Sequence, residues 1–296
     1  EQCTFFFDGE HNFTGHTPYI VKFNSSGTLD WYQLLGGDAV NYAQTISKID
    51  EHRILVAGNF WSSTLTLGAF SVVNSGASDG FWAIYNHTSL NWEGLWSTSE
   101  TGDVYFHSSA VGPKGEIVLG GSACWQISSC SINVEGMSLT NLTFAGFIVK
   151  LNHTSDDAWI MHTNWTANGN AQGVPVNSVD ISDHGDIMFS APSCANQNDL
   201  CRSYIDGIPI NQQANNATII VRVIQDLDKD GKYYARDDCP IGVSGWTSNS
   251  STDVDNDGCR DSDEDDDDDG DGILDFNDNC PLIIGNSTQD RLGCVD

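Results

Sequence analysis

Apolar and polar residues alternate through the first 225 positions, and the alternation recurs in three similar segments. The segments begin YIVKFN at Tyr19, FWAIYN at Phe81 and FIVKLN at Phe147. Each continues through an Asn-x-Ser/Thr sequence and a turn to a Trp six or seven residues later, and the copies are spaced by 62 and 66 residues. A period of two between Gly, Asn and Asp turns predicts antiparallel β-hairpins, and no stretch of ten residues follows the helical period.

Each segment is followed by a second apolar run, namely RILVAG, EIVLGG and DIMFSA, and further strand pairs follow, as from Thr64 to Val73. Four strands in about 60 residues are typical of a propeller blade. Residues 19–225 resemble SBBP-type β-propeller repeats, with IVKFNSSGTLDW matching the strand–turn–Trp signature. We therefore expect an all-β domain over residues 1–225, built from about three propeller-like four-stranded repeats. Three blades are too few to close a ring, which leaves an open array, a sandwich-like pile of sheets, or closure with a neighbouring subunit.

A Trp recurs once in each copy, as Trp31, Trp92 and Trp159. A large indole repeated at one position per blade is more typical of the packing between sheets than of ligand binding. We expect these three side chains to lie in the core.

The chain changes character at residue 226, where a fourth copy that begins at Thr218 runs into an acidic tail. Residues 226–296 hold 21 of the 41 acidic residues but only five Lys or Arg, in a chain with a formal net charge of -29. The acids follow the register of a calcium loop, with carboxylates at positions 1, 3, 5, 9 and 12 and Gly at position 6. Three loops begin at Asp226, Asp253 and Asp267, although the first has Tyr234 at position 9. The predicted ligands are Asp226, Asp228, Asp230, Asp237, Asp253, Asp255, Asp257, Asp261, Glu264, Asp267, Asp269, Asp271, Asp275 and Asp278. The alternative is a solvated, disordered run of like charge.

The tail also resembles the thrombospondin type 3 repeat, because Asp267 to Pro281 matches the pattern DxDxDGxxDxxDxCP almost throughout. The resemblance covers residues 226–296. It implies a second domain with little apolar core, wound around several calcium ions and stapled by the disulfides Cys239–Cys259 and Cys280–Cys294. Pairing of sequence neighbours would add Cys124–Cys130 and Cys194–Cys201. Cys3 is then left over, so it is free, bonded to another chain, or a sign that the pairing differs.

Nine cysteines and nine Asn-x-Ser/Thr sequences point to a secreted or cell-surface glycoprotein in an oxidising compartment. We expect the opening at Glu1 to be a mature end left by leader cleavage. Asn-rich hairpin turns are the alternative explanation of the repeated sites. The predicted glycosylation sites are Asn12, Asn24, Asn86, Asn141, Asn152, Asn164, Asn216, Asn249 and Asn286.

The sequence offers no basic patch for nucleic acid, no apolar run of membrane-spanning length, and none of the zinc, phosphate-loop or serine-nucleophile motifs. We therefore expect a protein that is not an enzyme. The apolar strand Thr4 to Phe7 either pairs with another chain or completes its own domain. These features favour a calcium-stabilised structural subunit that self-associates into an extracellular filament or fibre. The alternatives are a calcium-dependent adhesin or lectin-like protein that binds extracellular glycans or matrix and, third, a secreted hydrolase.

Overall fold

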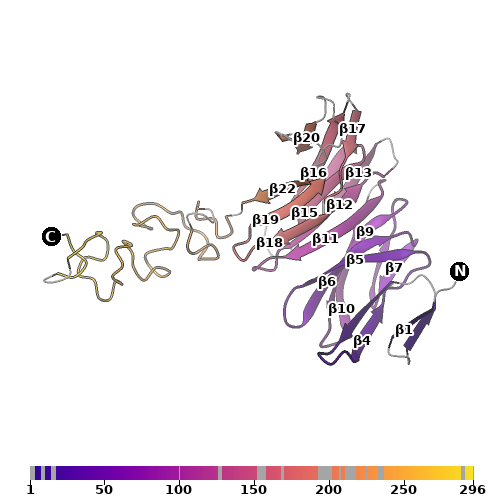
Figure 1. The fold of residues 1–296 in the computed structure, drawn as a ribbon, viewed down its shortest axis with the longest axis horizontal. Coiled ribbons are helices and arrows are strands. Elements are labelled where there is room, and N and C mark those ends of the chain that lie inside the picture. Colours follow the sequence, from indigo (N-terminus) through magenta and orange to yellow (C-terminus); the bar gives the residue numbers. More distant parts are fainter. Residues whose placement is uncertain are drawn as a thin grey trace. The chain divides into compact units, whose positions relative to one another are not determined.

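The structure is a computed structural model. It describes residues 4–7, 11–14, 18–99, 101–125, 129–151, 158–167, 170–192, 202–206, 208–210, 218–224, 226–232, 237–287 and 291–295. Within these ranges the chain forms strands, turns and irregular segments without a helix, so no helix there is long and apolar enough to cross a membrane. The prediction of an all-β fold is confirmed (Figure 1).

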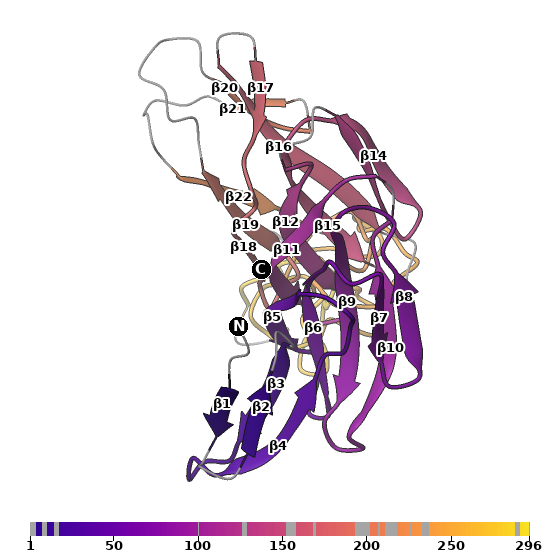
Figure 2. The same ribbon diagram turned by 90° about the vertical axis from the view of Figure 1, so that its right-hand side faces the viewer.

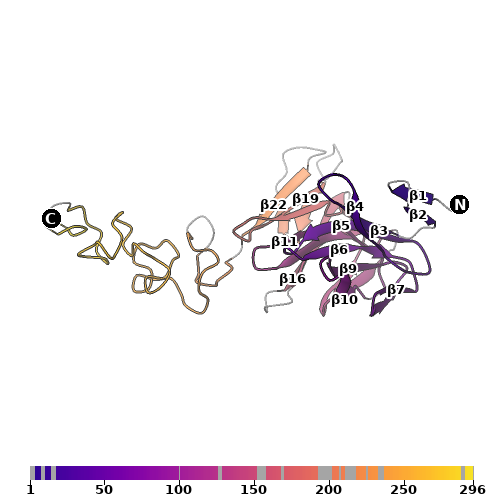
Figure 3. The ribbon, with the colours of Figure 1, turned by 90° about the horizontal axis from the view of Figure 1, so that it is seen from below.

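The first large sheet is a four-stranded antiparallel meander in the order β10-β9-β6-β5 (Figure 3). A separate hairpin, β7–β8, is inserted between its second and third strands, and β8 lies beside β10 (Figure 2). The bounds are β5 Asn41–Lys48, β6 Arg53–Phe60, β7 Thr64–Leu67, β8 Phe70–Val73, β9 Asp79–Asn86 and β10 Asn91–Ser97.

The second large sheet repeats this arrangement, with the meander β11-β12-β15-β16 and the hairpin β13–β14 inserted between β12 and β15. It is extended past β16 by β20 and β21, and β17 also pairs with β16. The bounds are β11 Val104–Val111, β12 Ile117–Ala123, β13 Cys130–Val134, β14 Met137–Leu142, β15 Ala145–Leu151, β16 Trp159–Ala167, β17 Asn170–Gly173, β20 Arg202–Ile205 and β21 Ile208–Ile210.

Smaller sheets stand at the two ends of this array. At the start, β3 pairs only with β4, and β1 pairs with β2, so the strand Thr4–Phe7 has a partner that the sequence did not suggest. At the end, a three-stranded sheet has the order β18-β19-β22. The described strands do not close into a ring. The bounds are β1 Thr4–Phe7, β2 His11–Thr14, β3 Tyr19–Phe23, β4 Leu29–Leu34, β18 Ser178–Ile181, β19 Ile187–Pro192 and β22 Thr218–Val223.

The central strands of the first meander are buried on both faces. On one face Leu55 and Trp82 pack with Phe106 and Phe147 of the second meander. On the other face lies a second cluster that includes the buried Trp92, with Trp31 packed against it. A strand covered on both sides reads as a continuous apolar run rather than an alternating one, which explains the sequence RILVAG. Of the three repeated tryptophans, Trp92 is buried, and Trp31 and Trp159 are half-buried.

A β-bulge recurs at the same place in both meanders. The register shifts between Ala43 and Thr45 in the first and between Phe106 and Ser108 in the second. Gly58 and Gly121 lie opposite these bulges, where a Cβ atom would collide with the backbone carbonyl of the neighbouring strand. Only glycine admits so close an approach, which explains the glycines of RILVAG and EIVLGG.

The chain divides into two compact units. The first, which we call the β body, comprises Glu1–Asp180 and Met188–Val221, and the second comprises Ile181–Ile187 and Arg222–Asp296 and so contains the acidic tail. Within the second unit, Arg222 forms an ion pair with the buried Asp186, and its Nε atom donates to Asp186 Oδ2 at 2.7 Å.

Candidate metal site

All three predicted loops of the acidic tail adopt the same local geometry. The backbone N–H of the Gly at position 6 donates to Oδ2 of the Asp at position 1, over 3.1, 3.2 and 2.9 Å in chain order. The Gly φ angles are +97°, +92° and +92°, in the left-handed region that favours glycine. The Asp at position 5 accepts from the N–H two residues later, over 2.6, 2.8 and 2.9 Å. The Asp and Gly residues therefore curl each loop without help from a helix or sheet.

This curl brings the carboxylates at positions 1, 3 and 5 together in every loop. The candidate ligand atoms in each set lie within 4.8 Å of one another. Calcium–oxygen bonds of about 2.3–2.6 Å place the ligands of one ion at most about 5 Å apart, so each set can share an ion. The three sets are Asp226, Asp228 and Asp230; Asp253, Asp255 and Asp257; and Asp267, Asp269 and Asp271.

Several carboxylate oxygens in the tail are buried without a protein donor. Asp230 is fully buried and Asp269 is 1% exposed, yet the Oδ2 atom of each accepts no hydrogen bond from the residues that the structure describes. A buried charged oxygen is costly unless something pairs with it. A hard divalent cation would satisfy these oxygens, and an all-oxygen donor set suits calcium.

The residues expected to close the loops behave differently in the second loop. Asp237 and Asp278 each accept from the N–H two residues later, over 3.0 and 2.6 Å. In the second loop Asp265 makes this bond, to Asp267 N at 2.9 Å, whereas Glu264 accepts from Val243 N. Burial raises the pKa of Asp255 most, and the charges of Asp257 and then Asp265 raise it further. Asp265 thus makes the hydrogen bond that the closing residues make in the other two loops, and Glu264 remains the predicted ligand at position 12.

A fourth cluster, which the loop register did not predict, joins Asp261, Asp265 and Asp268. Asp268 is 8% exposed, and its Oδ1 atom accepts no hydrogen bond from the described residues. Asp261 was expected at position 9 of the second loop, and its Oδ1 atom accepts from Val254 N at 3.1 Å. The signal was present in the unbroken run of acids from Asp263 to Asp269, with Asp261 just before it, but a uniform run does not indicate which members converge.

Disulfides hold the closing aspartates in place. The structure pairs Cys239 with Cys259 and Cys280 with Cys294, as the sequence predicts, and it also pairs Cys124 with Cys130. In the first tail pair Asp237 lies against Gly258, whose Cβ would stand 2.7 Å from Asp237 Oδ1. Asp278 lies against Gly293 in the same way. The three bonds indicate an oxidising environment, while Cys3, Cys194 and Cys201 lie outside the described residues.

The electrostatics of the tail oppose a cation-free, fully charged state. Burial and the charges of Asp228 and Asp230 raise the pKa of Asp237 to about 7. Burial and the charges of Asp275 and Asp261 raise the pKa of Asp268 to about 7. Carboxylates crowded in this way either hold protons or bind cations.

The predicted glycosylation sites differ in accessibility. Asn24, Asn141, Asn249 and Asn286 are exposed, and Asn86 is half-buried. Asn164 lies within β16, and its Oδ1 atom is buried without a hydrogen bond from the described residues. Asn152 and Asn216 lie outside the described residues, and Asn12 is described only as part of strand β2.

Comparison with known proteins adds no family assignment. No protein-family model matches the chain, and the search of curated proteins found no significant match. The resemblances to thrombospondin type 3 repeats and to propeller repeats therefore rest on local sequence motifs.

Proposed function

We propose that this chain is a secreted, N-glycosylated, calcium-stabilised structural subunit that associates with further copies of itself into an extracellular filament, fibre or surface layer. The observation that carries the proposal is an incomplete last sheet. In both meanders the third strand, β9 or β15, is covered on its outer side by a fourth strand, β10 or β16. Among the described residues, the last sheet ends with its third strand, β22, after which the chain continues to the loop that begins at Asp226.

The exposed edge of that sheet has the composition of a pairing strand. β22 reads TIIVRV, with the β-branched Ile220 76% exposed. An apolar edge strand is a template for a strand from another chain, which would gain main-chain hydrogen bonds and side-chain burial there. In the part of the chain that the structure describes, the first sheet, β3–β4, has two strands, so the described array is incomplete at both ends. Contacts between two different ends of a subunit generate open chains of subunits rather than closed dimers.

Calcium has a supporting role in this proposal. The candidate ions would neutralise the acidic tail and fix its fold, in the way that a structural metal contributes folding energy. The same proposal includes two resemblances. The propeller-like character of the β body is supported by its repeated meander, and the relation of the acidic tail to thrombospondin type 3 repeats is supported by its repeated loop geometry.

The test is electron microscopy and sedimentation of the purified full chain in calcium. We expect filaments or ordered arrays, and we expect Ile220→Lys to reduce assembly strongly because it places a charge on the pairing edge. Val73→Lys is the matched control, since Val73 is a β-branched residue of β8 with 69% exposure. A monodisperse monomer at high concentration with calcium present, or unchanged assembly of Ile220→Lys, would contradict the proposal.

A second candidate function, a binding module, is favoured by a separate observation, an aromatic pocket in the β body.

A further inference from the structure

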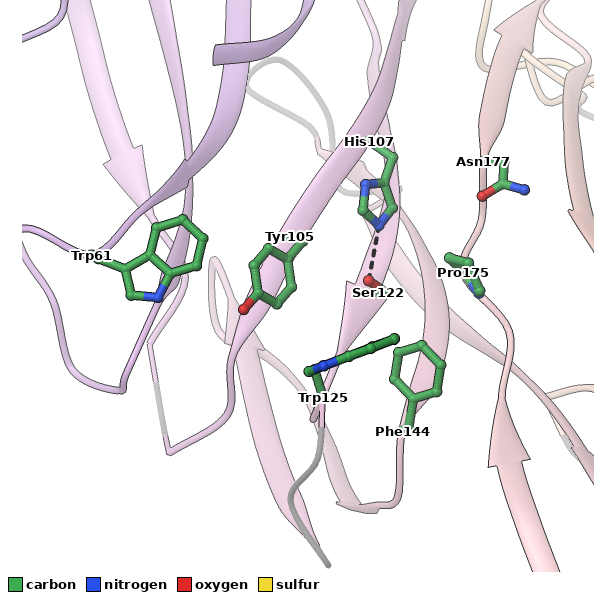
Figure 4. Close-up of a pocket in the computed structure, with 8 residues that line it drawn as sticks. All are labelled: Trp61, Tyr105, His107, Ser122, Trp125, Phe144, Pro175 and Asn177. Atoms are coloured by element: carbon green, nitrogen blue, oxygen red, sulfur yellow. Dashed lines mark hydrogen bonds between the residues drawn. The ribbon is translucent and has the colours of Figure 1, made fainter. Parts of the chain in front are cut away.

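A pocket of about 440 Å³ opens in the β body, away from the acidic tail in sequence (Figure 4). Its residues come from the end of β6, from β11 and β12, and from the segments that follow β12, β14 and β17. Small-molecule sites have volumes of roughly 300–1,000 Å³, so the pocket is large enough for an ordered ligand.

Two pairs of aromatic rings form opposite parts of the lining. Trp61 and Tyr105 lie with ring centroids 5.7 Å apart, and Trp125 and Phe144 meet edge to face at 4.8 Å (Figure 4). Trp61 is 38% exposed and Trp125 is 51% exposed. Tryptophan is on average highly buried, so two exposed indoles that line one hollow offer ring faces to a ligand.

Between the two aromatic pairs lies a polar pair. His107 Nε2 and Ser122 Oγ are 2.9 Å apart, and Ser122 is only 4% exposed (Figure 4). Burial lowers the pKa of His107, so its imidazole is neutral at pH 7 and can both donate and accept. Asn177 adds an amide, and the described lining residues include no Asp, Glu, Lys or Arg.

These features select the chemistry of the ligand. The absence of basic lining residues and a net charge of -29 on the chain disfavour an anion. An organic cation would gain from a carboxylate in contact with it, and none is among the described lining residues. A purely apolar ligand would bury the polar pair and the amide without using them. A neutral ring with an apolar C–H face and a rim of hydroxyl groups fits both kinds of lining.

We propose that this pocket binds a neutral pyranose unit of a glycan, with the sugar ring stacked on Trp125 or Trp61 and its hydroxyl groups bonded to His107 and Ser122. The sugar could belong to a free saccharide or to an N-glycan on another copy of the chain, and both have the same chemistry. The proposal is independent of self-association, since it uses neither β22 nor the acidic tail.

The test is saturation-transfer NMR and tryptophan fluorescence titration of the full chain in calcium. The probes are the methyl pyranosides of glucose, galactose and mannose. We expect saturable binding of at least one probe, and about tenfold weaker binding in Trp61→Ala or Trp125→Ala or both. Phe276→Ala is the matched control, because Phe276 is a tail aromatic with 79% exposure, and it should bind as the wild type does. Exposed side chains are truncated in each case, so folding should survive and can be checked by circular dichroism.

Two further experiments distinguish a free saccharide from a glycan of another copy, and a sugar from a competing peptide ligand. If glycans of other copies occupy the pocket, enzymatic deglycosylation should strengthen probe binding; if free saccharide is the ligand, binding should be unchanged. A proline-rich peptide is the competing occupant, because such peptides also dock in aromatic grooves. Binding of that peptide alone, absence of binding by all three pyranosides, or full binding in both Trp variants would overturn the proposal. None of these outcomes alters the assembly test with Ile220→Lys.

Discussion

Chelation of calcium should open the acidic tail to trypsin at Arg260. In the folded tail this residue is held locally, because its Nε atom donates to Asp263 Oδ1 at 2.7 Å and its carbonyl accepts from Glu264 N at 2.9 Å. Proteases cut segments that open locally or globally, so cleavage there reports the stability of the second loop and its neighbours.

The size of the effect follows from the spacing of the carboxylates. Two unit charges 4.8 Å apart repel by about 3 kcal/mol at an effective dielectric constant of about 20. Three such pairs in one cluster therefore oppose folding by on the order of 10 kcal/mol when all are ionised. That figure is comparable with the whole stability of a typical domain, about 5–15 kcal/mol. Without calcium, a tail of four such clusters should open or take up protons.

The disulfides make the assay unambiguous. Cys239–Cys259 lies wholly before a cut after Arg260, and Cys280–Cys294 lies wholly after it. Cleavage therefore releases residues 261–296 without reduction, and intact mass or a non-reducing gel detects the fragment. We expect release in a chelator, protection when calcium is restored, and little protection by magnesium, which demands a stricter octahedron. Arg260→Gln is the control that should not release the 261–296 fragment, so any longer fragment from cuts after Lys229, Lys232 or Arg236 is distinguished by its mass. Equal cleavage rates with and without chelator at neutral pH would refute the reasoning.

Three other outcomes follow from the structure. Gly258→Ala should weaken calcium binding, because the added Cβ would displace the Asp237 carboxylate. Gly245→Ala is the control, since Gly245 has the same φ of +92° with open space around it and the variant should suffer only left-handed strain of about 1–2 kcal/mol. Equal calcium titrations of the two variants would exclude a collision between the Cβ atom and Asp237. Burial raises the pKa of Asp79, so its contribution to stability is present below about pH 4 and lost as pH rises through its folded pKa. In Asp79→Asn the thermal midpoint should therefore depend less on pH than in the wild type. An unchanged pH dependence of the midpoint would count against this reasoning. Peptide mass mapping should find a glycan on Asn24, which is exposed, and none on Asn164, which lies within β16; an occupied Asn164 would contradict the accessibility argument.

The sequence predicts the parts of this molecule that depend on local geometry. The three loops begin at the expected residues because the Asp at position 1 and the Gly at position 6 meet within one turn, independently of the rest of the chain. The strands were also predictable, since outer strands such as β4 and β5 alternate in burial and central strands such as β12 are short continuous apolar runs bounded by turns. Glu264 remains the predicted closing residue of the second loop, although the neighbouring Asp265 makes the hydrogen bond that Asp237 and Asp278 make in the other loops.

The pocket could not be predicted from the same reasoning. Trp61 and Trp125 stand outside the position at which Trp31, Trp92 and Trp159 recur, but each closely follows the second apolar run of its copy, RILVAG or EIVLGG. They come together only because β11 lies against β5 and β6 and so brings Tyr105 beside Trp61. The repeat therefore relates the two indoles, but it does not show that their side chains line one pocket.

The acidic tail is better suited to a permanent structural role than to sensing calcium. In a calcium sensor, ion binding changes the angle between two helices that flank each loop and exposes an apolar groove. The described residues of this tail contain no helix, and each loop is held by its own backbone donors and by neighbouring carboxylates. The disulfides Cys239–Cys259 and Cys280–Cys294 join the segments in which Asp237 lies against Gly258 and Asp278 lies against Gly293. Loss of calcium therefore leaves no alternative packed state for the tail to enter, and the consequence of chelation should be loss of order rather than a switch.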